Sequence, residues 1–228
     1  MRPRTALLGL TLLVLTLLMQ VAAFAQGVHP ISGRRYAGVM GIGGADWLVR
    51  PEREMEEQPD RALDEIGIAK GSTVADVGAG AGYFVWRLAE RVGPTGKVYG
   101  NDIEPRMLDL LRSNVAQRKL ANVEPVLGTI SDTKLPPNAL DLVILVDVYH
   151  EFSEPQKMLA SIRSALKTDG RLVLLEYRAE DPAVPIRPEH KMTVEQVKSE
   201  ITPEGFRLER VSEKLPRQHI LIFRKSVQ

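Results

Sequence analysis

The stretch DVGAGAGYF, residues 76–84, combines residue types and a spacing that suit ligand binding. Gly78, Gly80 and Gly82 alternate with small residues directly after an apolar run. Glycine adopts left-handed backbone conformations and has no side chain, so a turn of this kind brings a ligand close to bare backbone. The same glycines are also compatible with a tight turn that holds no ligand.

Two common nucleotide ligands fit this turn poorly. A phosphate-binding loop for ATP needs a lysine and then serine or threonine after its last glycine, whereas Gly82 is followed by Tyr83 and Phe84. A dinucleotide turn has the spacing G-x-G-x-x-G, and its third glycine position falls on Tyr83. The turn therefore matches neither ATPases nor nicotinamide enzymes well. A nicotinamide oxidoreductase stays a weak alternative because its sheet would be similar.

A second reactive stretch, Tyr149-His150-Glu151, follows a continuous apolar run. His150 is the predicted general base, because histidine takes up a proton near neutral pH. Tyr149 is the second catalytic candidate, and either Tyr149 or Glu151 is suited to orient a substrate. The alternative for His150 is structural: it caps the next helix or fills a polar niche.

The chain shows no recognisable metal-ligand spacing. It has no cysteine, and its 4 histidines stand at positions 29, 150, 190 and 219. The stretch HEFSE lacks the second histidine of the helical two-histidine zinc motif. We therefore predict no metal site. The lack of cysteine also excludes disulfides and a catalytic thiol.

Strands and helices that alternate along the chain must position both stretches. Apolar runs predict the strands, and segments with helical periodicity predict the helices between them. The alternation predicts an α/β, Rossmann-like doubly wound fold, with a seven-stranded, mostly parallel sheet and helices on both faces. The short link 212–218 predicts an antiparallel C-terminal hairpin. The predicted strands are 73–77, 97–102, 123–127, 140–148, 171–177, 206–211 and 219–224, and the predicted helices are 52–66, 83–92, 105–119 and one after each of 153 and 193.

Local signals predict where several of these helices begin and end. Residues 153–156 and 193–196 both match a capping box, in which two side chains satisfy reciprocal backbone N–H groups. Gly170 is placed to end the helix that opens near residue 153. Pro59 predicts a break in the first helix. Residues 179–190 contain three prolines and predict a loop.

The pattern Asp-x-Gly-x-Gly-x-Gly resembles motif I of the class I S-adenosylmethionine-dependent methyltransferases. The context VYGNDIEPRML resembles the second-strand motif of the same family, in which an acidic residue precedes a helix that starts at proline. S-adenosylmethionine has no phosphate, so a site for it needs no phosphate-binding lysine. The resemblance implies that Asp102 accepts hydrogen bonds from the ribose hydroxyls. The cofactor-binding residues implied by these two motifs are Asp76, Gly78, Gly80, Gly82, Asp102 and Ile103.

The segment from Leu135 to Arg178 resembles the fourth- and fifth-strand region of the ubiquinone/menaquinone-biosynthesis-type methyltransferases, with LKTDG in place of LKPGG. This resemblance implies that Asp147 lies near the methionine part of the cofactor. After the third strand the family often has an acidic residue that binds the adenine. Thr129 stands at that place here, and Asp132, three residues further on, is the other candidate.

Composition is that of a globular domain, with 26% charged and 44% hydrophobic residues. The formal net charge of +1 gives no strong attraction to nucleic acid. Arg2 and Arg4 precede the uncharged run ALLGLTLLVLTLLM, and the small-residue site Ala23-Phe24-Ala25 follows it. These features predict a signal peptide over residues 1–25 that is cleaved after Ala25 and exports the protein to the periplasm or beyond. The alternative is an uncleaved membrane anchor.

The predicted organisation is a signal peptide (1–25), an irregular glycine-rich arm (26–50) anchored by Trp47 and Leu48, and one class I methyltransferase domain (51–228). The predicted function is transfer of a methyl group from S-adenosylmethionine to an unidentified small molecule. Because export removes the protein from the cellular pool of S-adenosylmethionine, the alternative is an exported, non-catalytic module that binds a small molecule on the same fold. We predict no nucleic-acid partner, and membrane contact only for an uncleaved N-terminus.

Overall fold

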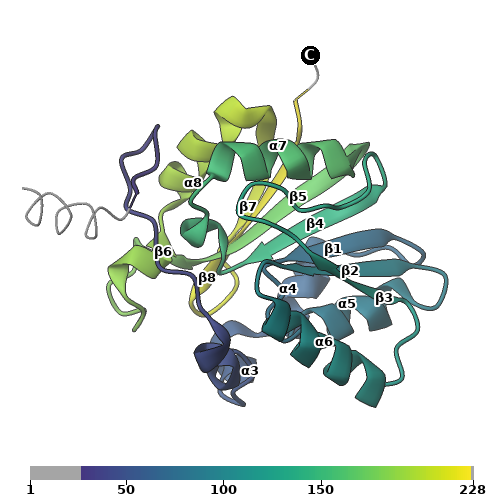
Figure 1. The fold of residues 1–228 in the computed structure, drawn as a ribbon. Helices are drawn as coiled ribbons and strands as arrows, with labels where there is room; N and C mark the ends of the chain where they lie inside the picture. Colours follow the sequence, from purple (N-terminus) through teal and green to yellow (C-terminus); the bar gives the residue numbers. More distant parts are fainter. Residues whose placement is uncertain (1–26, 227–228) are drawn as a thin grey trace, which may run out of the picture.

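The computed structural model describes residues 27–226, which build a single sheet covered by helices (Figure 1). The sheet has 8 strands; its path runs β3-β2-β1-β4-β5-β8-β7, and β6 pairs with β5 off this path. β8 is antiparallel to β5 and β7, whereas the remaining pairs are parallel. The strands are β1 (Thr73–Val77), β2 (Lys97–Asp102), β3 (Val123–Leu127), β4 (Leu140–Val146), β5 (Leu166–Arg178), β6 (Lys191–Met192), β7 (Phe206–Ser212) and β8 (Gln218–Lys225).

Helices cover both faces of the sheet, as the doubly wound prediction requires. In Figure 1, α7 and α8 lie on one side of the sheet and α4, α5 and α6 on the other. Short 3₁₀ turns, η2 (Tyr149–Glu151) and η3 (Pro188–His190), lie near the carboxyl ends of β4 and β5. The helices are α2 (Ala45–Leu48), α3 (Arg53–Glu57), α4 (Pro59–Ile66), α5 (Val85–Val92), α6 (Pro105–Gln117), α7 (Pro155–Ala165) and α8 (Val194–Ile201).

The two-sided cover explains why the central strands are apolar throughout. Val143 and Leu145 of β4 join the core under α7 and α8, whereas Leu142 and Ile144 join the core under α4, α5 and α6. All four side chains are buried. Successive residues of a strand point to opposite faces, so a strand buried on both faces reads as a continuous apolar run.

Most of the predicted architecture is confirmed. The residue bounds of β1, β2 and β3 match the prediction, and the chain closes with the predicted antiparallel hairpin of β7 and β8. The predicted break before Pro59 is present, because Gln58 adopts a left-handed conformation (φ 49°) between α3 and α4. Thr193 and Gln196 form the predicted reciprocal capping box of α8.

The predicted capping box at residues 153–156 is wrong. α7 begins at Pro155, its N-cap residue is Glu154, and no side chain caps it. The Gln156 side-chain amide instead donates to Glu204 at 3.1 Å. A proline in the first helical turn lacks the N–H that would need a cap, so this helix start is stable without one.

Gly170 does not end α7, contrary to the prediction. The helix ends at Ala165 and the chain enters β5 at Leu166, so that Gly170 lies within the strand. A Cβ atom at Gly170 would lie 2.8 Å from the carbonyl oxygen of Leu140. The glycine is therefore required for the close approach of β4 and β5.

β6 is an eighth strand that the sequence did not predict. Its two residues pair in parallel with Tyr177 and Arg178 at the end of β5. Two residues carry no periodicity, and they directly follow the proline-rich segment 179–190 that was predicted to be a loop. The pairing brings η3 to the carboxyl edge of the sheet.

The arm is anchored mainly by polar contacts. Arg34 donates from Nε and Nη2 to the two carboxylate oxygens of Glu200 on α8, each at 3.1 Å, and Glu200 is fully buried. Arg34 Nη1 and the backbone N–H of Ala37 both donate to the carbonyl oxygen of His150, at 2.9 and 3.0 Å. Of the two predicted anchors, Trp47 is 41% exposed and is not one, whereas the side chain of Leu48 packs against Gly80 of the glycine turn. The arm therefore holds η2 in place through backbone hydrogen bonds.

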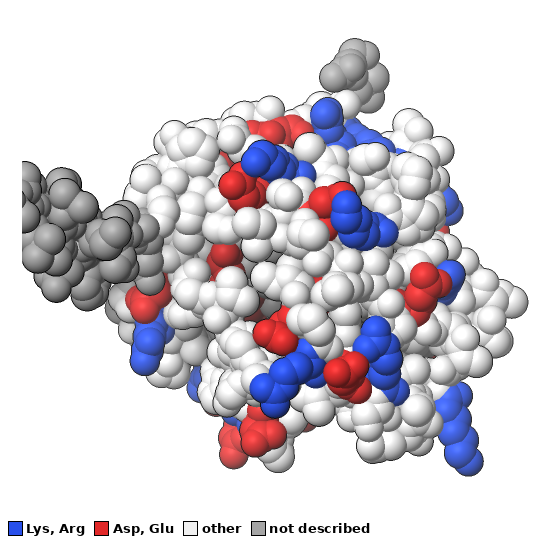
Figure 2. Space-filling model, in the orientation of Figure 1, with Lys and Arg blue, Asp and Glu red and all other residues white. Residues whose placement is uncertain are grey.

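The predicted signal peptide, residues 1–25, lies outside the described residues. Within residues 27–226, no helix is long and apolar enough to cross a membrane. Acidic and basic side chains are interspersed on the face of the molecule shown in Figure 2. Localisation, the division into arm and domain, and the partners of the protein stay predictions.

Replacement of Arg34 tests the anchor of the arm. In Arg34→Gln the buried Glu200 carboxylate loses its bidentate partner, and removing one member of a buried ion pair costs about 3 kcal/mol or more. We expect the free energy of unfolding in urea to fall by about that amount. Arg35→Gln, an exposed neighbour, serves as the control. Equal free energies of unfolding for Arg34→Gln and Arg35→Gln would contradict the conclusion that Arg34 anchors the arm.

Candidate functional site

A cavity of about 540 Å³ opens at the carboxyl ends of β1, β2, β4 and β5. Open α/β sheets bind ligands at this edge, and the volume is typical of a small-molecule site. The arm and the segment before β6 complete the walls. The lining residues fall within 39–53, 76–84, 101–107, 129–130, 146–158 and 177–190.

The glycine turn uses its N–H groups inside the protein. Gly78 and Ala79 both donate to the carbonyl oxygen of Asn101, at 2.8 and 2.9 Å. Gly80 donates to Oδ2 of Asp102 at 2.8 Å. A phosphate-binding turn needs such N–H groups to point at the ligand. The structure therefore supports the conclusion that this turn is not a phosphate loop.

The three glycines have different roles, although all have positive φ (79°, 52° and 88° for Gly78, Gly80 and Gly82). Gly78 and Gly80 line the cavity, whereas Gly82 does not. A Cβ atom at Gly78 would lie 2.4 Å from Val148, and one at Gly82 would lie 3.2 Å from Leu111. The expectation that all three make room for a ligand is therefore corrected: Gly82 allows α6 to pack on the turn, and Gly78 allows the close approach of Val148.

Asp102 organises the turn and faces the cavity. Besides Gly80, its carboxylate accepts the N–H of Glu104 at 2.9 Å. Both Asp102 and Ile103 line the cavity. Glu104 caps α6, where its side chain accepts the N–H of Arg106. Burial raises the pKa of Asp102 above its ordinary value. Each oxygen of Asp102 has a further lone pair, so the carboxylate can still accept hydrogen bonds from hydroxyl groups of a ligand.

Asp147 lies in the bend between β4 and η2 with a left-handed backbone (φ 50°) and lines the cavity. Its Oδ2 accepts the side-chain amide of Gln218 at 2.7 Å. Among the described residues, its buried Oδ1 has no hydrogen-bond partner. Burial, with the nearby carboxylates of Glu57 and Glu176, raises the pKa of Asp147 well above its ordinary value. A cationic donor group on a ligand would satisfy this oxygen.

Three residues that build one part of the cavity wall were not among the predicted site residues. Arg53, which lines the cavity, donates to both oxygens of buried Glu57 at 2.8 and 2.6 Å. The hydroxyl of Tyr177, which also lines the cavity, donates to Glu57 at 2.8 Å. The only sequence signal was the i, i+4 spacing of Arg53 and Glu57, which is equally typical of an exposed helical pair.

Thr129 lies in the exposed loop after β3 and lines the cavity, whereas Asp132 does not. The Asp132 carboxylate instead accepts hydrogen bonds from Lys134 at 2.6 Å and from Ser161 at 3.0 Å. Hydrogen bonds from Lys134 lower the pKa of Asp132 to about 2. Of the two candidates for the adenine contact, only Thr129 is therefore at the cavity.

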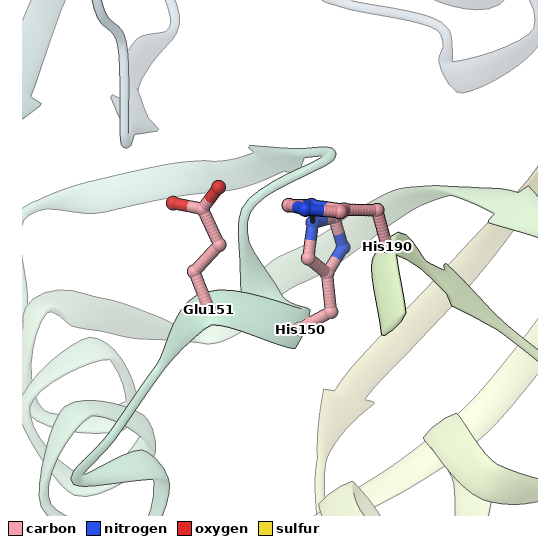
Figure 3. A group of neighbouring side chains, drawn as sticks. All are labelled: His150, Glu151 and His190. Carbon is pink, nitrogen blue, oxygen red and sulfur yellow. Dashed lines mark hydrogen bonds between the residues drawn. The ribbon is translucent and has the colours of Figure 1, made fainter. Parts of the chain in front are cut away.

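His150 is buried at the cavity wall and is oriented by Glu176 of β5. The Nδ1 atom of His150 lies 2.6 Å from Oε2 of Glu176. A carboxylate only accepts hydrogen bonds, so Nδ1 carries the proton and Nε2 keeps a lone pair. This Nε2 lies 3.1 Å from Nδ1 of His190 on η3 (Figure 3). The lone pair of the predicted base therefore accepts a hydrogen bond from Nδ1–H of His190 at the cavity wall.

Glu151 completes a compact group with the two histidines. His150 and Glu151 project to the same side of η2, and His190 meets them from η3 (Figure 3). One ligand atom from each of the three residues lies within 4.8 Å of the others. Burial raises the pKa of Glu151 to about 7, and burial together with His150 lowers the pKa of His190. The prediction of no metal site relied on the spacing of histidines along the chain. It does not hold for the folded protein, because β6 brings His190 close to His150.

Tyr149 is placed away from the cavity lining. It is fully buried, and its hydroxyl lies 3.5 Å from Nε2 of His29 on the arm. Its backbone N–H donates to Oε1 of Glu176 at 3.1 Å. Burial raises the pKa of the Tyr149 phenol well above its ordinary value. Tyr149 thus fixes η2 and is not positioned to contact a substrate.

Comparison with known proteins identifies the family. A family model described as a methyltransferase domain matches residues 68–215. The chain belongs to this methyltransferase family. Its structure is also similar to that of a SAM dependent methyltransferase from Aquifex aeolicus, with a TM-score of 0.75 and 29% identity over 79% of this chain and 96% of that one. The predicted family and fold class are confirmed.

Curated methyltransferases match part of this chain. The arsenite methyltransferase of Halobacterium salinarum is 35% identical over 107 residues, which cover 47% of this chain and 27% of the relative. The demethylmenaquinone methyltransferase of Geobacillus is 31% identical over 114 residues, covering 50% of this chain and 49% of the relative. The match thus spans half or less of both relatives, whose names point to different acceptors.

Ionisation of Asp76 at the cavity wall gives a pH-dependent prediction. Burial and the nearby Asp102 raise the pKa of Asp76 from 3.8 to about 7. The folded state therefore holds this proton more tightly than the unfolded chain does, and the free energy of unfolding falls as pH rises from about 4 to 7. Asp76→Asn lacks this titration.

We expect Asp76→Asn to gain stability over the wild type as pH rises, by about 3 kcal/mol between pH 5 and 8, since about two pH units of this range lie below the folded pKa and each is worth about 1.4 kcal/mol. Urea unfolding of both proteins between pH 5 and 8 measures the difference. Asp169→Asn, an exposed change, should follow the wild type at every pH. A difference in the free energy of unfolding that stays the same at every pH would refute the raised pKa of Asp76.

Proposed function

We propose that this protein transfers a methyl group from S-adenosylmethionine to a small-molecule acceptor. The observation that carries the proposal is the charge of the cavity wall. The wall has two arginines, Arg53 and Arg187, and four acidic residues, Asp76, Asp102, Asp147 and Glu151. Arg53 is already paired with Glu57. Such a wall favours a ligand with positive groups and no phosphate, and S-adenosylmethionine carries a sulfonium and an ammonium.

The residues at the sheet edge fit the parts of this cofactor. Asp102 is suited to accept hydrogen bonds from the two ribose hydroxyls. The unpartnered Oδ1 of Asp147 is suited to accept one from the ammonium group. Ile103 and Met107 offer an apolar wall for the adenine ring, and Thr129 also lines the cavity.

The acceptor is proposed to bind on the other side of the cavity, beside His150. Apolar side chains from the arm and from the segment before β6, among them Met40 and Ile186, line this region with Phe152. When bound, S-adenosylmethionine supplies a methyl group on a positively charged sulfur. The acceptor lone pair forms a bond to the methyl carbon, and the sulfur leaves with the electron pair of the broken carbon–sulfur bond. A hydroxyl or phenol acceptor must also lose a proton. The group of His150, Glu151 and His190 is where that proton leaves, and His150 stays the predicted base.

The carboxylate of Asp102 provides the test of cofactor binding. Asp102→Asn removes the charge that accepts the ribose hydroxyls, and loss of a hydrogen bond to a charged group corresponds to about a 10- to 100-fold loss of affinity. We expect calorimetry with S-adenosylmethionine to show this loss. Asp109→Asn, an exposed change on α6, should bind like the wild type. Wild-type protein that gives no heat at millimolar S-adenosylmethionine would overturn the proposal.

A turnover assay separates the enzyme from an exported, non-catalytic binding module. The protein is incubated with S-adenosylmethionine and a panel of phenols, catechols, thiols and hydroxy acids, and formation of S-adenosylhomocysteine is measured. An enzyme produces S-adenosylhomocysteine with at least one class of acceptor. Binding of S-adenosylmethionine without turnover across the panel would favour the non-catalytic alternative.

A further inference from the structure

We propose that His150, Glu151 and His190 bind a divalent transition-metal ion at the acceptor side of the cavity. Binding of the ion is argued from these three side chains alone, whereas its role in catalysis rests on the proposed function. The two histidines offer nitrogen ligands and Glu151 offers a carboxylate oxygen, and all three line the cavity.

The distance between the two histidine nitrogens suits a shared ion. Nε2 of His150 and Nδ1 of His190 are 3.1 Å apart. Two nitrogens that are each about 2.1 Å from one ion lie about 3.0 to 3.4 Å apart at octahedral to tetrahedral angles. A Glu151 oxygen lies within 4.8 Å of a ring nitrogen of each histidine. It stands at the end of a flexible side chain that leaves η2 on the same side as His150 (Figure 3). A torsional adjustment of Glu151 therefore completes the set.

Glu176 supplies the support that metal-binding histidines usually have. Such a histidine donates its other ring N–H to a carboxylate or carbonyl, which fixes its tautomer and its direction. Nδ1 of His150 meets Oε2 of Glu176 at 2.6 Å, and Glu176 is fully buried. The arm also holds His150 in place, since Arg34 and Ala37 donate to the carbonyl oxygen of His150. The Nε2 lone pair of His150 thus has a defined direction.

The donor set indicates which ions bind. Two imidazoles and one carboxylate suit zinc, cobalt or nickel, whereas magnesium and calcium prefer oxygen ligands. Three protein ligands leave at least one coordination position open, and it faces the cavity. A hydroxyl acceptor bound there would lose its proton to solvent more readily, because the ion stabilises the resulting oxyanion. With the ion bound, His150 is a metal ligand and no longer the base. The ion then promotes loss of the acceptor proton.

Calorimetry with zinc chloride on the purified, tag-free protein tests the inference. We expect one zinc ion per chain and at least 10-fold weaker binding of magnesium. Cobalt should give visible absorption bands typical of nitrogen coordination. Glu176→Gln should weaken zinc binding by about 10- to 100-fold, the usual effect of losing such a supporting carboxylate.

Variants of the ligands decide between this site and zinc bound elsewhere. His190→Gln and Glu151→Gln should each weaken zinc binding at least 10-fold, whereas Glu154→Gln, three residues further along and paired with Lys157 outside the cavity lining, should not. Thermal unfolding checks that each variant is folded. Wild-type protein without zinc binding, or folded His190→Gln with unchanged binding, would overturn the inference.

Calorimetry with S-adenosylmethionine on the same samples keeps the two proposals apart. A protein that binds S-adenosylmethionine but does not bind zinc would refute the metal site and leave the methyltransferase proposal standing. Zinc binding without S-adenosylmethionine binding would support the site and refute the proposed function. If both bind and turnover stops when a chelator is added, the ion acts in the reaction.

Discussion

The carboxyl edge of the sheet holds more carboxylate than the protein neutralises, and the character of the cavity depends on this imbalance. Glu57 is matched by Arg53, and Glu176 is matched by the ring N–H of His150 and a backbone N–H. Asp76 and Asp147 have no such matching cation, and burial raises the pKa of both. A cationic ligand would relieve this cost, because an opposite charge favours the ionised carboxylate. A phosphate would increase it.

The same imbalance explains how a glycine-rich turn can avoid phosphate binding. In a phosphate loop the backbone N–H groups point at the ligand and supply positive potential. Here the N–H of Gly80 points at Asp102, and those of Gly78 and Ala79 point at the end of β2. Asp102 thus takes up the donor that would otherwise bind an anion and presents its own negative charge to the cavity. The turn and the acidic residue after β2 act as one unit.

The parts of the fold that carry periodicity could be predicted from the sequence, and the parts made by single contacts could not. The bounds of β1, β2 and β3 follow from short apolar runs. Gly170 was read as a helix end, because the sequence does not show that β4 passes so close. The group of His150 and His190 was missed because a two-residue strand joins segments far apart in the chain. The sequence could not decide between Thr129 and Asp132 for the adenine contact, because residue spacing does not show which of the two side chains faces the cavity.

The family match covers one part of the cavity wall and leaves another part outside it. Residues 68–215 match the methyltransferase domain, and they include the glycine turn, Asp102, Asp147 and both histidines of the cavity. Met40, on the acceptor side, lies outside the matched region, as do the arm residues that hold the carbonyl oxygen of His150.

The shape of the acceptor region therefore depends on contacts that the family match does not cover. Arg34 donates to the backbone of η2 and to buried Glu200 with the same guanidinium, so the arm links η2 to α8. Relatives that share the central domain can thus bind the same methyl donor and still differ in acceptor.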